Sequence, residues 1–165
     1  MIRTMTVDDT DKVYRIETSS FFRPMSKKDL VSDIEKNKHK RHFVYEKNGE
    51  TVGFYIISKI LDEVEIYTIA VDELYRGQKI ASNMLEHLIN FSKEMKVSKI
   101  WLEVSTKNMP AINLYEKFGF EKIRLRKNYY SLTNEDAFIM LKELIWKIFI
   151  LWELRHLAMI PQFLF

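Results

Sequence analysis

The chain has 165 residues, a length that fits one domain with a substantial core. Hydrophobic residues make up 47% and charged residues 30% of it, as in a globular protein, and the formal net charge of +3 is too small to indicate nucleic-acid binding. The absence of cysteine excludes disulfides and thiolate chemistry, and the four histidines lack metal-ligand spacing. From the histidine spacing we expect no metal. The N-terminus lacks the apolar core of a signal peptide, so we expect a cytoplasmic protein.

The first 60 residues predict a short strand, two helices and a hairpin. Ile2–Met5 has the character of a strand, and Thr6–Asp9 and Ser26–Asp29 each place an acidic residue three positions after a capping hydroxyl, which starts a helix. Asn48-Gly49 then separates two apolar runs, which is typical of a tight hairpin. The expected hairpin strands are 42–47 and 51–60.

An aromatic loop connects the two expected helices. It begins with Phe21 and Phe22. Aromatic side chains in a loop can line a site for a peptide or a small molecule. The favoured interpretation is that they fill a gap beneath the loop.

The centre of the chain predicts a strand, a loop and a helix. Residues 63–71 are rich in β-branched and aromatic residues, and from Ile80 onward the apolar residues step by four, as on one face of a helix. The loop between them contains Arg76 and Gly77. Because a helix start presents unpaired N–H groups, phosphate binding is the functional interpretation. The alternative is an ordinary flexible connection.

The remaining part of the domain predicts a parallel crossover. Residues 98–104 form another strand, and a chain that reaches it through a helix favours a right-handed parallel arrangement. Asn108 is a good cap for the next helix, and Gly119 stands where this helix should end. Two closing strands are expected at 120–125 and 137–141. The predicted order β-α-α-β-β-β-α-β-α-β-β makes a mixed α+β domain over residues 1–142.

Residues 143–165 form an intensely apolar extension that charges interrupt. The segment is too short and too charged to predict a transmembrane span. It is consistent with a helix docked on the domain, a dimerisation arm or an interfacial anchor. A protein-packed helix is favoured, and a homodimer through this tail is one expectation.

The segments together resemble the GNAT superfamily of acetyl-CoA-dependent N-acetyltransferases, over roughly residues 2–141. The similarity is greatest to the branch that acetylates the N-terminal alanine of ribosomal proteins (RimI type). The residues that carry it are 75–81, 102–104, Asn108, 111–120, 126–130 and 135–137. The resemblance implies the fold of that superfamily and acetyl-CoA as cosubstrate, with no metal.

The resemblance implies that the pyrophosphate of acetyl-CoA lies on the backbone of the loop and helix start, and that the preceding strand pairs with the pantetheine. The implied cosubstrate-binding residues are Ile69, Ala70, Val71, Arg76, Gly77, Gln78, Lys79, Ile80, Ala81, Ser82 and Asn108. Lys79 stands where family members usually carry glycine. A negative φ at this position preserves the site, whereas a positive φ strains any residue with a side chain.

Two residues match the family's acid–base pair. Glu103 matches the base that takes a proton from the acceptor amine, and Tyr115 matches the acid that protonates the leaving thiolate. The alternatives are an ordinary carboxylate on a strand and a core aromatic. Asn108 has a plain helix cap as its alternative. Ser105 departs from the family, which commonly has arginine there.

For the acceptor, Tyr129 and Tyr130 are expected to form a groove for a peptide N-terminus, with Phe21 and Phe22 opposite; packing is the alternative. The sequence therefore predicts N-α-acetylation of a protein N-terminus, with a ribosomal protein as the candidate partner. The alternatives are acetylation of a small amine or a lysine side chain, a CoA-binding module without catalysis, and membrane attachment through the tail.

Overall fold

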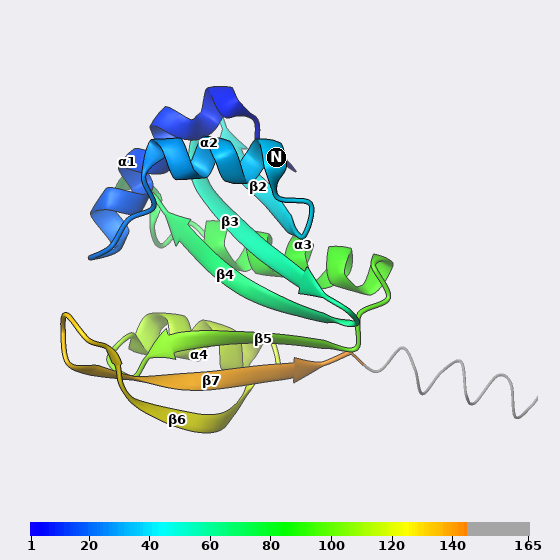
Figure 1. The fold of residues 1–165 in the computed structure, drawn as a ribbon, viewed down its shortest axis with the longest axis vertical. Coiled ribbons are helices and arrows are strands. Elements are labelled where there is room, and N and C mark those ends of the chain that lie inside the picture. Colours follow the sequence, from blue (N-terminus) through cyan, green and yellow to red (C-terminus); the bar gives the residue numbers. More distant parts are fainter. Residues whose placement is uncertain (145–165) are drawn as a thin grey trace, which may run out of the picture.

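The computed structural model describes residues 1–144, which form one mixed seven-stranded sheet in the order β1-β2-β3-β4-β5-β7-β6 (Figure 1). The strands are β1 (Ile2–Thr4), β2 (Lys40–Lys47), β3 (Glu50–Ile60), β4 (Glu63–Val71), β5 (Lys99–Ser105), β6 (Glu121–Tyr130) and β7 (Glu135–Glu143). The α-helices are α1 (Thr10–Ser20), α2 (Lys27–Lys36), α3 (Ile80–Glu94) and α4 (Met109–Lys117). Two short 3₁₀ turns, η1 (Val7–Asp9) and η2 (Glu73–Tyr75), precede α1 and α3.

Local signals in the sequence start and end these elements. Ser26 accepts a hydrogen bond from the N–H of Asp29 at 3.1 Å, which caps α2, and Asn108 caps α4 by accepting from Ala111 N–H at 3.2 Å. The β2–β3 hairpin turns at Asn48 and Gly49, both in the left-handed region. The first helical signal differs in detail, because Thr6–Asp9 opens a 3₁₀ turn before α1 begins at Thr10.

The sheet is divided into two halves by the way β4 and β5 diverge. The two strands are parallel, as predicted, but they pair only from Glu63 to Glu65 on β4 and from Lys99 to Trp101 on β5. Beyond these residues they separate, which Figure 1 shows as a wedge that opens away from the Glu63 end. Within residues 1–144, one edge of β4 is therefore without a strand partner after Glu65, while its other edge pairs with β3 from Glu63 to Val71 with one interruption.

A β-bulge lies in the middle of β4. Ile56 of β3 pairs with Thr68 and Ile57 pairs with Ile66, so Tyr67 is an extra residue without a partner on β3. A bulge shifts the alternation of side chains by one position. Accordingly, Ile66 and Ile69 both contact the larger core, although three positions separate them.

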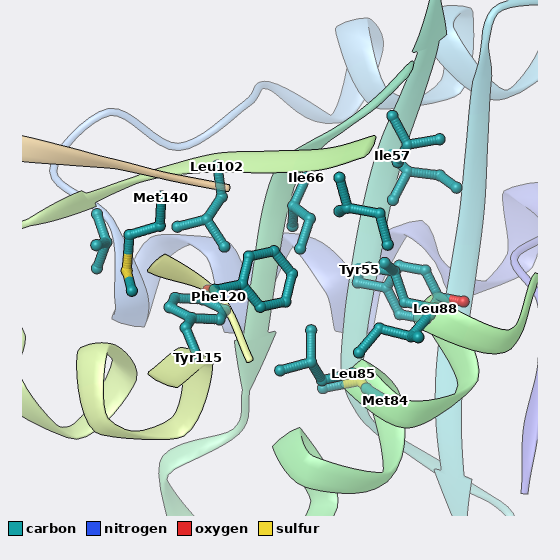
Figure 2. Close-up of a cluster of buried hydrophobic side chains, with 14 of the residues drawn as sticks. Tyr55, Ile57, Ile66, Met84, Leu85, Leu88, Leu102, Tyr115, Phe120 and Met140 are labelled. Carbon is teal, nitrogen blue, oxygen red and sulfur yellow. The ribbon is translucent and has the colours of Figure 1, made fainter. Parts of the chain in front are cut away.

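The two faces of the sheet are covered unequally. The larger core packs α3 and α4 on one face, and it includes Tyr55, Leu85, Leu102 and Tyr115 (Figure 2). The smaller core packs α1 and α2 on the other face of the β2–β4 half. Gly53 allows α3 to pack closely, because a Cβ there would lie 3.1 Å from Ala70 O and 3.2 Å from Met84 Cε.

The predicted element order and the mixed α+β class are confirmed. The two closing strands are longer than expected, so Tyr129 and Tyr130 belong to β6 rather than to a loop. β7 ends at Glu143, and Leu144 is buried against the larger core. The helix and the dimerisation arm expected in the tail lie outside the described residues. Within 1–144, no helix has the length and apolarity needed to cross a membrane.

Candidate active site

A cavity of about 1050 Å³ lies in the wedge between β4 and β5. Its walls come from both halves of the sheet and from the α1–α2 loop. Of the residues assigned to a site from the sequence, those that line the cavity are Phe21, Phe22, Ile69, Glu103, Asn108, Tyr115, Tyr129 and Tyr130. Segments that are far apart in the sequence thus meet around one space, since the cavity lining runs from Glu17 to Glu135.

Glu103 lies in the part of β5 that has already separated from β4. Its side chain is only 11% exposed and forms an ion pair with Arg126 of β6. The Arg126 guanidinium also lies over the ring of Tyr129, 4.9 Å from its centroid. Burial, and then a hydrogen bond with Glu103, raise the pKa of Tyr129, so this phenol is protonated at neutral pH. Arg126 and Tyr129 therefore hold the Glu103 carboxylate in place.

Tyr115 lies on α4 and reaches the cavity from the core side of the sheet. The residue is 6% exposed, and its ring packs against Phe120 with a centroid distance of 5.7 Å. Burial raises the pKa of the phenol, and the nearby Tyr130 adds to this effect. Tyr115 is thus a core aromatic whose protonated phenol also lines the cavity, and its role as the acid stays a prediction.

The wall near the start of α4 is polar. Asn108 caps the helix and also lines the cavity, so the cap is confirmed and the contact with acetyl-CoA stays a prediction. Ser105, the residue that departs from the family pattern, donates a hydrogen bond to Glu135 at 2.5 Å. Lys107 lies 3.3 Å from the same carboxylate. A hydroxyl, a carboxylate and an ammonium group therefore form this wall.

Aromatic residues form the mouth of the cavity. Phe21 and Phe22 follow α1, and their exposed fractions are 38% and 81%. Tyr129 and Tyr130 come from β6, with their rings in an edge-to-face contact at 5.0 Å. The favoured interpretation of Phe22, a plug beneath the loop, is wrong, because such an exposed ring fills no gap. The alternative, aromatic side chains along a site, describes both pairs.

The strand edge and the loop at the other end of β4 form a second, backbone-lined region. In the part of the chain that the structure describes, β4 has no strand partner on its β5 side beyond Glu65, so an extended ligand can pair with that edge as a strand would. At the start of α3 the N–H of Asn83 makes the first helical bond, to Lys79 O at 3.0 Å. The preceding N–H groups have no partner within the helix and form a site for an anion.

These features fit the two parts of acetyl-CoA, an extended pantetheine arm and a pyrophosphate. Arg76 adds a cation at the loop, and its Nε donates to Val71 O at 3.3 Å. The other implied cosubstrate residues do not line the cavity, which ends at Ile69 on this strand; these are Ala70, Val71, Arg76, Gly77, Gln78, Lys79, Ile80, Ala81 and Ser82. The cavity and the loop before α3 are thus separate sites that follow one another along β4.

Lys79 has a positive φ, the conformation that was expected to strain a residue with a side chain at this position. Its φ is +61° and its ψ is 11°, in the left-handed region, directly before α3. A negative φ at this position is therefore not kept. The backbone follows a glycine-like path, and the lysine side chain carries the conformational cost.

Several charged groups of the cavity were not predicted from the sequence. Glu65, Lys40 and Glu17 line it, and Arg126 holds Glu103. The alternation along 63–66 was a usable signal, since it predicts that Glu65 faces away from the core residues Val64 and Ile66. No comparable signal pointed to Glu17 or Lys40. Residues 1–144 hold no cluster of three or more metal-ligating side chains.

Comparison with known proteins supports this arrangement. Residues 10–120 match the model of the acetyltransferase (GNAT) family. The ribosomal protein bS18-alanine N-acetyltransferase of Escherichia coli (strain K12) is 36% identical over 141 residues, which cover 84% of this chain and 94% of the relative. A protein of Bacillus subtilis (strain 168), provisionally assigned the same activity, is 37% identical over 139 residues, covering 84% and 92%.

A solved structure gives the same result in three dimensions. The crystal structure of the ribosomal-protein-S18-alanine N-acetyltransferase from Escherichia coli superposes with a TM-score of 0.79 at 34% identity, covering 87% of this chain and 92% of that one. Similarity in sequence and in fold thus extends over nearly the whole described chain. The chain belongs to the GNAT family and is an N-acetyltransferase that uses acetyl-CoA as its cosubstrate.

Proposed function

We propose that the protein acetylates the α-amine of a protein N-terminus, and that the N-terminal alanine of a ribosomal protein is the first acceptor to test. The observation that carries the proposal is the Glu103 carboxylate, fixed by Arg126 inside a cavity whose mouth is aromatic. Relatives at 36–37% identity whose names give a ribosomal protein alanine as acceptor support the choice of substrate.

In this proposal Glu103 and Tyr115 divide the proton transfers. Bound acetyl-CoA supplies the activated acetyl group. An ammonium has no free lone pair, so Glu103 takes its proton, directly or through a water molecule. Tyr115, which burial keeps protonated, gives its proton to the thiolate that leaves. The two groups lie on β5 and α4, so the acetyl transfer takes place between them.

The backbone of β4 and of the loop before α3 is proposed to bind the cosubstrate. The free edge at Ile69, Ala70 and Val71 pairs with the pantetheine. The N–H groups of residues 78–82, with Arg76 and Gly77 beside them, receive the pyrophosphate. Asn108 adds a contact from the start of α4.

The aromatic mouth is proposed to hold the acceptor peptide. Phe21 stands on one side, and Tyr129 and Tyr130 stand on the other. Aromatic rings bury much area at a low entropy cost, which suits a peptide in extended conformation. Because the ring of Phe22 is 81% exposed before any acceptor binds, burying it on binding would favour a peptide over a small amine.

The test is calorimetric titration with acetyl-CoA followed by turnover of an Ala-starting peptide. Matched acceptors are the same peptide with a blocked N-terminus and an internal lysine, and a polyamine. We expect acetyl-CoA binding and turnover of the free N-terminus alone. Turnover of the lysine or of the polyamine at a similar rate would overturn the assignment of the acceptor. Failure to bind acetyl-CoA would count against the proposed loop.

Two expectations about the whole chain stay predictions. A homodimer through the apolar tail would make the full chain dimeric and a chain ending at Leu144 monomeric, which light scattering measures. The same number of chains per particle for the full-length and the shortened protein would exclude the tail from the interface. The cytoplasmic location is a prediction that fractionation of cells tests.

A further inference from the structure

The cavity contains a second carboxylate, Glu65, close to Glu103. Glu65 is in register with Trp101 at the closed end of the wedge, and Glu103 follows two residues later on β5. Two residues span about 6.6 Å along a strand and point to the same face. Both carboxylates line the cavity, and the negative charge of Glu103 raises the pKa of Glu65.

Glu65 differs from the other acidic residues of the cavity in its lack of partners. Asp33 pairs with Lys40, Glu103 with Arg126, and Glu135 with Lys107. Glu17 accepts from Met25 N–H at 3.2 Å, and Asp29 accepts from Ser26 Oγ at 2.6 Å. Of the acidic residues that line the cavity, Glu65 alone has neither a hydrogen bond nor a salt bridge within residues 1–144.

Within residues 1–144, no cation of the cavity lining forms an ion pair with Glu65. Glu103 and Arg126 cancel each other, and Lys40 is engaged by Asp33 at 2.9 Å and by the ring of Tyr67 at 3.8 Å. Glu65 is also half-buried, which makes an unpaired charge costly. Burial and the neighbouring Glu103 raise its pKa, and Lys40 opposes them. A ligand with one positive charge would remove this cost.

We infer that Glu65 binds the ammonium group of the acceptor and brings it beside Glu103, which takes the proton. The inference rests on the proposed function, since it assigns the charge-selecting residue of the same acceptor site. An α-amine has a pKa of about 8, so most acceptor molecules arrive as ammonium ions at pH 7. The attraction to Glu65 therefore acts on the form that is present, before any proton is lost. An uncharged acceptor gains nothing from it.

The test is a cycle that removes each charge separately. One peptide begins with alanine, and its match begins with a propionyl group, which has the same shape without the ammonium. Their dissociation constants are measured by calorimetry at pH 7 in the presence of CoA, which prevents turnover. The wild type, Glu65→Gln, Glu65→Asp and the control Glu63→Gln are compared. Glu63 lies on the same strand and outside the cavity lining.

We expect the wild type and Glu63→Gln to prefer the ammonium peptide by about tenfold or more, as a close charge pair provides. In Glu65→Gln this preference should fall to about twofold, while the affinity for the propionyl peptide stays the same. Glu65→Asp should recover part of it. If Glu65 had only a structural role, Glu65→Gln would lower the affinity for both peptides equally. An unchanged preference of Glu65→Gln for the ammonium peptide would overturn the inference.

Turnover separates this inference from the proposed function. If the wild type acetylates the alanine peptide but Glu65→Gln keeps the full ammonium preference, only the role of Glu65 falls. If the wild type neither binds nor acetylates the alanine peptide, both fall. In the supported case, Glu65→Gln raises the KM for the peptide about tenfold and leaves the KM for acetyl-CoA unchanged.

Discussion

The two halves of the sheet contribute to the site in different chemical terms. Apart from Glu65 and the aromatic α1–α2 loop, the β1–β4 half offers backbone groups: the edge of β4 that has no strand partner within residues 1–144 and the N–H groups at the start of α3. The β5–β7–β6 half offers side chains, namely Glu103, Tyr115 and Arg126. A site made of backbone tolerates a change such as lysine for glycine at position 79, whereas a site made of ionisable side chains loses its chemistry with one substitution.

Replacing the carboxylate of the side-chain half should have the largest effect. Glu103→Gln keeps the shape but removes the proton acceptor, so we expect kcat to fall by about 10²–10⁴-fold. The dissociation constant for acetyl-CoA, measured by calorimetry, should stay within about twofold. Glu121→Gln, an exposed acid at the start of β6, is the control. A kcat within a few-fold of the wild type would transfer the base role to another group.

Removing the phenol of Tyr115 should have the next largest effect. Tyr115→Phe retains the packing against Phe120 but removes the proton donor, and we expect kcat to fall by about 10²-fold. Thermal unfolding should change little, because the hydroxyl has no role in the core packing. Tyr14→Phe on α1 is the matched control, and an equal loss in both variants would point to a general effect on the fold.

The N-terminal half has its own ionic anchor, which tests whether the halves are independent. Asp9 is buried and accepts hydrogen bonds from Arg3, Thr6 and Thr51. Burial raises the pKa of Asp9, but these bonds outweigh burial and lower the pKa to about 2. The stabilisation is present above pH 4 and is lost as the pH falls towards 2.

We therefore expect Asp9→Asn to lower the free energy of unfolding at pH 7 by about 1–2 kcal/mol, after allowance for solvent screening. The difference from the wild type should shrink below about pH 3 in urea titrations. The kcat of the folded variant should stay close to that of the wild type, because the anchor lies outside the side-chain half. A difference independent of pH would show that Asp9 acts through shape rather than charge.

The smallest effect is expected at the backbone-lined end. Lys79→Gly removes a side chain from a residue with φ of +61°, so the free energy of unfolding should rise by about 0.5–1 kcal/mol. The affinity for acetyl-CoA should change by less than about threefold, since the N–H groups remain. Lys79→Ala keeps the strain and removes the charge, which separates the two effects. A large loss of affinity in both variants would assign the phosphate contact to the ammonium.

The elements were predictable wherever local chemistry determines them. The strand at Glu63–Val71, the helix from Ile80 and the caps at Ser26 and Asn108 follow from side-chain period and capping. β6 was predicted too short, because the alternation of apolar residues at Ile123 and Leu125 stops before residues 126–130, where the pairing with β7 is irregular.

Within the site, Glu103 and Tyr115 were identified through the family pattern, while their surroundings were not. The ion pair of Arg126 with Glu103 joins positions 23 residues apart, and the wedge depends on how many residues of β4 and β5 pair. Neither is encoded in a local pattern. Glu65 was readable as an outward-facing acid, but its lack of a partner is a property of the folded cavity.

The extra residue at Tyr67 divides β4 into two segments of opposite phase. On the side of Glu65 the even-numbered residues face the larger core, and on the side of Val71 the odd-numbered ones do. The segment before the bulge places Glu65 in the cavity proposed for the acceptor, and the segment after it carries the edge that we propose pairs with the cosubstrate. Deleting Tyr67 would turn the side chains of one segment to the opposite face of the sheet, and would therefore change the cavity and the edge together.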